Sequence, residues 1–353
     1  MLDSLCFIKE SLDSSLAHAI KSRGGVTQIC RRVAGASHDF AIRVELEIEG
    51  DRIEYEFEIG VEGRGGFVVK QESLTSRAAS YRVVQGHVVR ALSGSAPPAA
   101  PDRLYLAIVA GLPELRGVHE QLVSMGFYNL NPEKMKQPQI NDAGQLLHRD
   151  GRNIASVFAG LARDRPPTLD RIVRYLGAII PNVTAVTHAS LGAWETLELW
   201  QKIEGVEDPL RFYLASTSDG TLRALGALVA VAQRSDTGAP MSLVGVEEPE
   251  TTLHPVGVGA LMKAFREAAA HTQIIITSHS PDLVDRIVDD DRLLVAQSIQ
   301  GLTFVGVVDR ASRDAIETRL YTPGDLLRMD QLCVDRDDLA RQQSLTVLGG
   351  YRG

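Results

Sequence analysis

The N-terminal part of the chain passes from one hydrophobic period to another. Apolar residues first recur at helical spacing, at Leu5, Ile8, Leu12, Leu16 and Ile20, which predicts an amphipathic helix over residues 1–21. From residue 40 the period becomes two, because "FAIRVELEIEG" and "DRIEYEFEIG" alternate apolar and charged residues and "GGFVVKQE" follows. This pattern predicts an antiparallel meander over residues 40–72 with one face in solvent.

The rest of the chain shows helical and then mixed periodicity. "SGSAPPAAP" at 93–101 is expected to be a loop, and helical patterns with Pro and Gly breaks continue to about residue 200. In the C-terminal third, the short apolar run Ser242 to Val246 predicts a buried parallel strand. A helix with Leu261 and Phe265 on one side follows, and then a second buried strand at Ile274 to Thr277. A strand, helix, strand unit of this kind places both strands parallel in one sheet.

Composition and charge narrow the class of protein. With 44% hydrophobic and 23% charged residues the chain is an ordinary globular protein. Its net charge of -8 argues against a basic surface for non-specific nucleic-acid binding and leaves room for a local Arg patch. Cys6, Cys30 and Cys333 are widely spaced and form no metal-binding pattern. No apolar run reaches the roughly 18 residues of a membrane helix, and the start is not that of a signal peptide. We therefore expect a cytoplasmic protein with no membrane partner.

Polar residues follow both predicted strands of the C-terminal third. Glu247 and Glu248 come directly after the first strand, and His279 comes after the second. Ligands of parallel sheets bind beyond the carboxyl ends of the strands, so we expect these three side chains at one rim. Upstream, in "STSDGTLRALGALVAVAQ", Ser218 is a natural N-cap of a helix whose free N–H groups suit a phosphate.

Each of these pieces also has a purely structural interpretation. Adjacent glutamates after a strand usually form a solvated turn, a single histidine is usually hydrogen-bonded within the fold, and Ser-Asp-Gly before a helix is ordinary capping. Order, spacing and shared location favour the joint functional interpretation.

The succession "TSDGTLR", "SLVGVEEPETTLHP" and "QIIITSHSPDLVD" resembles the signature, Walker B plus D-loop, and switch-histidine motifs of ABC-type ATPases. It is most similar to the predicted-ATPase group related to RecF, SMC and OLD-type heads, and "SLAHAIKSRGG", "FYNLNP", "DGRNIASV" and "YTPGDLL" also resemble that group's pattern. The resemblance implies an α/β fold, namely a P-loop NTPase head of ABC type with a parallel sheet core, an antiparallel β meander and a helical lobe. It implies ATP and Mg²⁺ as ligands and ATP hydrolysis as the activity. The single head would have lobes at 1–110, 111–235 and 236–310 and a tail at 311–353.

The resemblance also implies roles for the residues at the strand ends. Glu247 matches the Walker B acid that holds Mg²⁺ through water, and Glu248 matches the residue that orients or deprotonates the attacking water. His279 matches the residue that contacts the γ-phosphate. These residue types agree with the chemistry, because hydrolysis at a γ-phosphate is mostly positioning and charge neutralisation.

The signature motif implies a partner subunit. Ser218, Asp219, Gly220 and Thr221 match the signature positions, which in this family reach the γ-phosphate of a nucleotide bound to the opposite subunit; Asp219 replaces the second-last glycine of the transporter version. Glu250 to His254 would form the D-loop across the interface. The resemblance thus implies a head-to-tail homodimer that sandwiches two ATP molecules, with DNA or an effector protein as a further partner.

A site of this kind also needs a GxxxxGK[ST] loop, whose backbone amides wrap the β-phosphate and whose lysine reaches the β and γ oxygens. The sequence does not contain one, since none of its seven lysines follows a glycine. In the resembling family the loop leads directly into a helix like residues 2–21. We expect a truncated or wrongly started version of an active ATPase, inactive alone. The alternative is a regulatory or structural head that has lost nucleotide binding.

A metal nuclease of the Toprim type is a third interpretation. It would use Glu247 and Glu248 with the run Asp289 to Asp291. That fold places its aspartates after a strand, whereas these precede "RLLVAQ". We therefore rank this interpretation below the other two.

Overall fold

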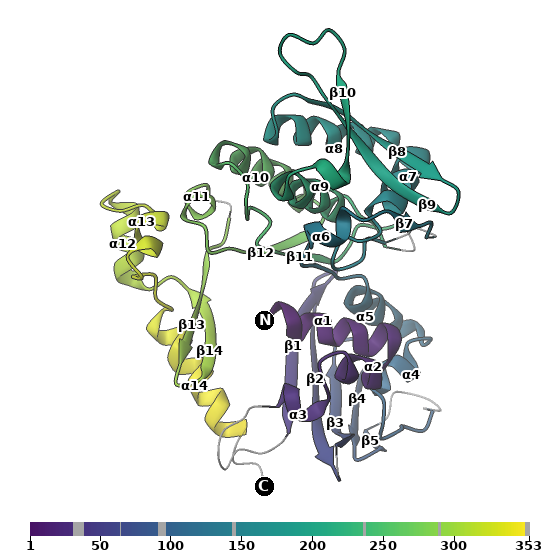
Figure 1. Cartoon of the computed structure of the whole chain (residues 1–353). Coiled ribbons are helices and arrows are strands. Elements are labelled where there is room, and N and C mark those ends of the chain that lie inside the picture. Colours follow the sequence, from purple (N-terminus) through teal and green to yellow (C-terminus); the bar gives the residue numbers. More distant parts are fainter. Residues whose placement is uncertain are drawn as a thin grey trace. The chain divides into compact units, whose positions relative to one another are not determined.

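The computed structural model describes residues 1–30, 39–63, 65–90, 97–142, 146–235, 238–288 and 291–349. The chain divides into two compact units, Met1–Met125 and Gly126–Gly353. Figure 1 shows the helices and strands of both units in sequence colours. Across the described ranges, none of the helices combines the length and the apolar character that crossing a membrane requires. Residues 93–96 of the predicted loop lie outside the described residues, and the predicted division into three lobes and a tail stays a prediction.

The first unit is built on a five-stranded antiparallel meander in the order β1-β2-β3-β4-β5. Apolar and charged residues alternate along β2, so that Tyr55 and Phe57 are buried while the glutamates that alternate with them are half-buried. The predicted meander is confirmed and continues past residue 72. The strands are β1 (Phe40–Ile48), β2 (Asp51–Glu62), β3 (Gly66–Thr75), β4 (Ser80–Val84) and β5 (His87–Arg90).

The predicted N-terminal helix is confirmed, with one irregular turn. It consists of α1 (Leu2–Glu10), a π-helical turn (Ser11–Ser15) and α2 (Leu16–Lys21), and α3 (Val26–Ile29) follows. Phe7 of α1 packs against two rings of the meander, with centroids 5.5 Å from Phe40 and 6.3 Å from Phe57. The apolar stripe of the helix therefore covers the buried face of the sheet.

A buried carboxylate joins the meander to the helix that follows it. Glu72 of β3 is fully buried and accepts hydrogen bonds from the hydroxyls of Tyr55 (3.0 Å) and Tyr81 (2.7 Å). It also accepts from the backbone N–H groups of Tyr105 and Leu106, which begin α4 (Tyr105–Val109). Burial raises the pKa of Glu72, and the four donors oppose that rise. α5 (Pro113–Val123) completes the unit.

A three-stranded parallel sheet forms the centre of the second unit. Its order is β12-β11-β6, with β6 (Gly126–Tyr128), β11 (Leu243–Glu247) and β12 (Gln273–Thr277). Glu247 lies opposite Thr277, and Val246 lies opposite Tyr128. The two strands predicted from the apolar runs are confirmed, and so is their parallel pairing. All three strands therefore end at one rim.

Within the described part of residues 126–284, six helices lie in the segments that join or follow the strands of the parallel sheet. α9 packs against α8, and α10 packs against both (Figure 1). α9 is buried almost all round because its sequence is a run of Ala, Gly, Leu and Val with few polar residues. The helices are α6 (Pro132–Met135), α7 (Ile154–Asp164), α8 (Pro166–Ile179), α9 (Asp219–Val231), α10 (Pro255–Ala269) and α11 (Pro281–Val284).

The expectation that helical structure continues to about residue 200 is wrong. α8 ends at Ile179, and residues 183–213 form most of a second, antiparallel sheet. Its runs "VTAVTHASL" and "WETLELWQ" are rich in β-branched and aromatic residues, which favour strands over helices. The strands are β7 (Gln139–Ile140), β8 (Val183–Leu191), β9 (Trp194–Gln201) and β10 (Leu210–Tyr213), and a 3₁₀ turn (Leu214–Ser216) leads on.

The C-terminal segment contacts the parallel-sheet region through its helix α13, which packs against α11. The backbone N–H of Gly324 in α13 donates to Asp285, next to α11, at 2.6 Å, and Arg328 pairs with Asp282 of α11 at 3.6 Å. α13 thus holds the segment that directly follows β12. The elements are β13 (Leu294–Ile299), β14 (Leu302–Val307), α12 (Arg310–Glu317), α13 (Pro323–Arg328) and α14 (Arg336–Gly349).

Candidate functional site

The ends of β11 and β12 bring the predicted acidic residues and histidine to one rim. The backbone N–H of Glu248 donates to the carbonyl of Thr277 at 2.9 Å, which continues the strand pairing by one residue. Glu248 Oε1 lies 3.9 Å from His279 Nε2. The His279 side chain is 90% exposed and that of Glu248 48% exposed, so both are open to a ligand. The structure thus brings these groups together, while their catalytic roles stay predictions.

Glu247 is engaged on both carboxylate oxygens. Asn129 donates to Oε2 at 3.1 Å, and Arg149 donates to Oε1 at 3.0 Å. Asn129 directly follows β6, so its side chain reaches the same rim from the third strand. Sequence reasoning missed both residues because β6 has only three residues and shows no readable period. The available signal was the run "FYNLNP", which contains Asn129, and the run "DGRNIASV", which begins directly after Arg149.

These contacts define how Mg²⁺ could be held. No cluster of three or more carboxylate, imidazole or thiol ligands occurs among the residues that the structure describes, so no metal cage made by the protein alone is found there. Mg²⁺ is usually bound by one or two carboxylates together with phosphate oxygens and water. Glu247 fits that role at the rim, although the ion would have to displace the guanidinium of Arg149 from Oε1.

The turn after β11 has an unusual backbone. Glu248 (φ 43°) and Thr252 (φ 68°) both occupy the left-handed region, which is rare for residues other than glycine. Glu250 between them is buried at 6% exposure and accepts a hydrogen bond from the Ser278 hydroxyl. Burial raises the pKa of Glu250, and its second oxygen, Oε2, has no hydrogen-bond partner among the residues that the structure describes. The Glu250 side chain is therefore buried and bonded to Ser278, whereas the side chains of Glu248 and His279 are accessible to a ligand.

The predicted signature residues form the N-terminus of α9. The Ser218 hydroxyl caps the helix by accepting from the Thr221 N–H at 3.3 Å, and the two side-chain oxygens lie 2.7 Å apart. Asp219 pairs with Lys136 at 2.7 Å. Gly220 is buried, and a Cβ there would lie 2.6 Å from the carbonyl oxygen of Thr252. The signature helix thus packs directly on the turn that carries Glu248.

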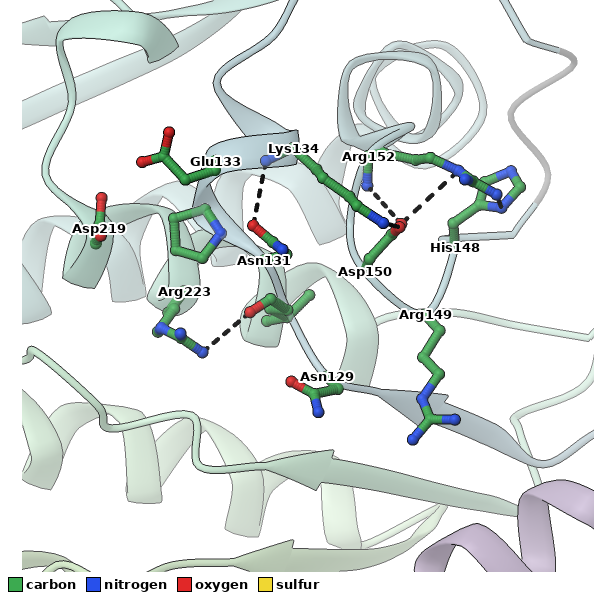
Figure 2. Close-up of a pocket in the computed structure, with 12 residues that line it drawn as sticks. Asn129, Asn131, Glu133, Lys134, His148, Arg149, Asp150, Arg152, Asp219 and Arg223 are labelled. Atoms are coloured by element: carbon green, nitrogen blue, oxygen red, sulfur yellow. Dashed lines mark hydrogen bonds and ion pairs between the residues drawn. The ribbon is translucent and has the colours of Figure 1, made fainter. Parts of the chain in front are cut away.

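A cavity of about 680 Å³ lies beside the rim. Figure 2 shows Lys134 and Arg152 turned toward Asp150, whereas Arg149 points away from that trio. Asn129 and Arg149 both line this cavity and both contact Glu247, so the cavity opens onto the rim. It is lined by Asn129, Leu130, Asn131, Pro132, Glu133, Lys134, His148, Arg149, Asp150, Arg152, Asp219 and Arg223.

The acidic run invoked for a Toprim-like nuclease gains no support. Asp289 and Asp290 lie outside the described residues. Asp291 accepts hydrogen bonds from Arg266 at 2.7 Å and from the Val288 N–H at 3.1 Å. Because Arg266 lies in α10, these bonds give Asp291 a structural role. Its pKa is lowered by the hydrogen bonds from Arg266 and Val288, against the opposing effect of burial.

Comparisons with known proteins bear on this site. A family model described as AAA domain, putative AbiEii toxin, Type IV TA system, matches residues 98–285, more than half of the chain. The solved Smc head bound to the C-winged helix domain of ScpA is 11% identical, with a TM-score of 0.41 over 74% of this chain and 76% of that one. An Smc head from Pyrococcus furiosus, bound to the C-terminal domain of ScpA, is 10% identical, with a TM-score of 0.38 over 76% and 80%. The SMC head domain from Thermotoga maritima is 12% identical, with a TM-score of 0.34 over 73% and 74%. No curated protein matches the chain.

Proposed function

The chain belongs to the AAA domain family described as putative AbiEii toxin, Type IV TA system, and from this premise we propose that it is a Mg²⁺-dependent ATP-hydrolysing head. One observation carries the proposal: Glu247, Glu248 and His279 occupy the same rim of a parallel sheet. Ligands bind beyond this edge in open α/β sheets. A metal-directed carboxylate, a second carboxylate and an imidazole in one place are the groups that hydrolysis of a phosphoanhydride requires.

Each residue of the rim has a distinct task in this proposal. Glu248 is half-exposed, and its carboxylate can hold an attacking water by accepting one of its protons. His279, 3.9 Å away, can donate a hydrogen bond to a γ-phosphate oxygen. Glu247 would hold Mg²⁺, which when bound would supply positive charge to neutralise the phosphate oxygens. Asn129 fixes the Glu247 carboxylate from the side of β6.

The assembly that we propose is a head-to-tail homodimer. Ser218 lies exposed at the N-terminus of α9, where free backbone N–H groups and the helix dipole favour a phosphate. In the proposed dimer, Ser218 to Thr221 of one subunit face the γ-phosphate held by the partner. DNA or an effector protein is the proposed further partner of the dimer.

A second candidate function rests on a specific observation. The 353 residues contain no GxxxxGK[ST] loop, which in P-loop proteins binds the β-phosphate. A regulatory or scaffolding head would use the same fold with no nucleotide. Hydrolysis, by contrast, requires such a loop from outside these residues.

The deciding experiment compares the chain with a version extended at its N-terminus by a strand and a GxxxxGK[ST] loop. We expect the extended chain to hydrolyse ATP. Glu248→Gln should lower its turnover by about 100-fold or more while ATP binding persists, because a positioned catalytic group is lost. Glu204→Gln, an exposed glutamate after β9, is the matched control and should change nothing. Near-normal hydrolysis by Glu248→Gln would refute the assigned role. No hydrolysis by the extended chain would favour the scaffolding head.

A further inference from the structure

Arg149 contacts the carboxylate of Glu247. The proposed function assigns Mg²⁺ to this same carboxylate. The guanidinium NH2 lies 3.0 Å from Oε1, and the two side chains are 42% and 30% exposed. A carboxylate paired with a guanidinium is a poorer ligand for a cation, because the positive charge beside it repels the ion. Sequence motifs gave no role to Arg149.

The loop that carries Arg149 is held in place by its own hydrogen bonds. Asn153, 5% exposed, donates to the carbonyl of Leu146 at 2.8 Å and accepts from the His148 N–H at 2.7 Å. The backbone N–H of Asn129 donates to the carbonyl of Arg149 at 2.8 Å. The loop is therefore fastened to the end of β6, and the side chains of Asn129 and Arg149 reach Glu247 together.

The neighbouring cations of the cavity are committed elsewhere. Lys134 lies 2.8 Å and Arg152 3.8 Å from Asp150, as Figure 2 shows. Arg223 donates to the carbonyl of Leu130 at 3.0 Å. Arg149 thus differs from these three in being directed at Glu247.

We propose that Arg149 is a latch on Glu247: it occupies the carboxylate when no metal is bound, and a divalent cation must displace it. The inference rests on the proposed function, which gives Glu247 its role toward the metal. Because both side chains are partly exposed, the ion pair is weak, and a divalent cation can open it. The released guanidinium has the flat, forked donor geometry that suits phosphate oxygens, and Arg149 lines the cavity. Arg149 is therefore a positioning residue that sets the metal concentration at which the site becomes occupied.

The test measures Mn²⁺, an oxygen-binding substitute for Mg²⁺, by electron paramagnetic resonance on the 353-residue chain without nucleotide. Arg149→Gln should bind Mn²⁺ roughly fivefold to tenfold more tightly than the unaltered chain, because one nearby positive charge is gone. Arg149→Lys, which keeps the charge, should bind as weakly as the unaltered chain. Arg152→Gln, a matched change in the same loop, should also leave the affinity unchanged.

Glu247→Gln locates the effect. Combined with Arg149→Gln, it should abolish the gain, because the carboxylate that the latch covers is absent. The proposal is overturned if Arg149→Gln binds Mn²⁺ no more tightly than the unaltered chain, or if neither binds it. It is also overturned if the gain survives Glu247→Gln. These outcomes involve no ATP, so failure of the latch leaves the hydrolysis test of Glu248 standing, and failure of hydrolysis leaves the latch standing.

Discussion

Glu250 differs from Glu247 and Glu248 in that its carboxyl group is buried, with one oxygen hydrogen-bonded to Ser278 and the other without a partner in the described part of the chain. Burial raises its pKa above the ordinary value of a glutamate. A carboxyl group with a raised pKa binds its proton more tightly in the folded state than in the unfolded state. Its ionisation therefore costs stability, and the cost grows as the pH rises from the unfolded pKa to the folded one.

A substitution at Glu250 should expose this cost. We predict that Glu250→Gln is more stable than the unaltered chain at pH 7 by about 1 kcal/mol, a typical effect of one imperfectly satisfied buried polar group. The advantage should shrink as the pH falls toward about 4, because the glutamate then takes up its proton in the unfolded state as well. Urea unfolding between pH 4 and pH 8 measures it. Glu204→Gln, an exposed position that leaves Glu250 in place, is the control; equal slopes in all three proteins would contradict the prediction.

At the same scale, the sequence indicated some site residues and not others. Glu247, Glu248 and His279 could be placed because each lies within two residues of the end of a strand that an apolar run reveals. Asn129 and Arg149 could not, because their contact with Glu247 joins residues more than ninety positions apart in the sequence. A contact of that kind depends on how a loop folds back, which no local spacing encodes.

At the scale of elements, the N-terminus of α9 and the turn after β11 are fitted to each other. Gly220 leaves room for the carbonyl oxygen of Thr252, and an added Cβ would lie 2.6 Å from it. The backbone of Thr252 is already in the left-handed region. A side chain at position 220 would therefore push against backbone that has little freedom to move.

We predict that Gly220→Ala destabilises the chain by roughly 1–3 kcal/mol, the usual cost of overpacking. Gly117→Ala is the matched control, since Gly117 also lies in a helix, α5, and nothing lies within 4 Å of its added Cβ. That change should stabilise by roughly 0.5–1 kcal/mol, because alanine favours a helix over glycine. Chemical denaturation followed by circular dichroism measures the change in the free energy of unfolding for both variants. A stabilising effect of Gly220→Ala would contradict the prediction, because it would show that the turn at Thr252 can move to make room for the added Cβ.

The elements themselves were predictable where one period extended over many residues. The N-terminal helix and the meander followed from sustained patterns, although the π-helical turn Ser11–Ser15 leaves no mark on the spacing of apolar residues. β8 and β9 were missed because short runs such as "VTAVTHASL" lie among helices and were absorbed into their pattern. β6, with three buried residues, is too short to show any period.

At the scale of the whole molecule, the rim presents negative charge to a ligand that is itself negative. Glu247 and Glu248 adjoin each other, and the 353 residues contain no GxxxxGK[ST] loop to offset the repulsion from a triphosphate. We predict that this chain binds Mg-ATP with millimolar affinity or weaker, at most about 4 kcal/mol at the standard state.

Isothermal titration of the purified chain with Mg-ATP is the measurement, with ATP titrated into buffer as the blank. Hydrolysis by the same sample should stay at the level of that blank. Micromolar binding would mean that some other segment of these residues supplies the phosphate contacts, and the cavity beside β6 would be the first place to look.

The left-handed backbone of Glu248 has a consequence for how the sequence can drift. An L-residue in that region costs about 1–2 kcal/mol, and glycine avoids the cost. Selection for thermal stability alone would therefore tend to replace Glu248 by glycine. That substitution would remove the carboxylate from the rim. Under that selection the protein would become more stable to heat while losing the carboxylate on which the proposed chemistry depends. Retention of glutamate at this strained position through many generations would reveal that something other than folding maintains it.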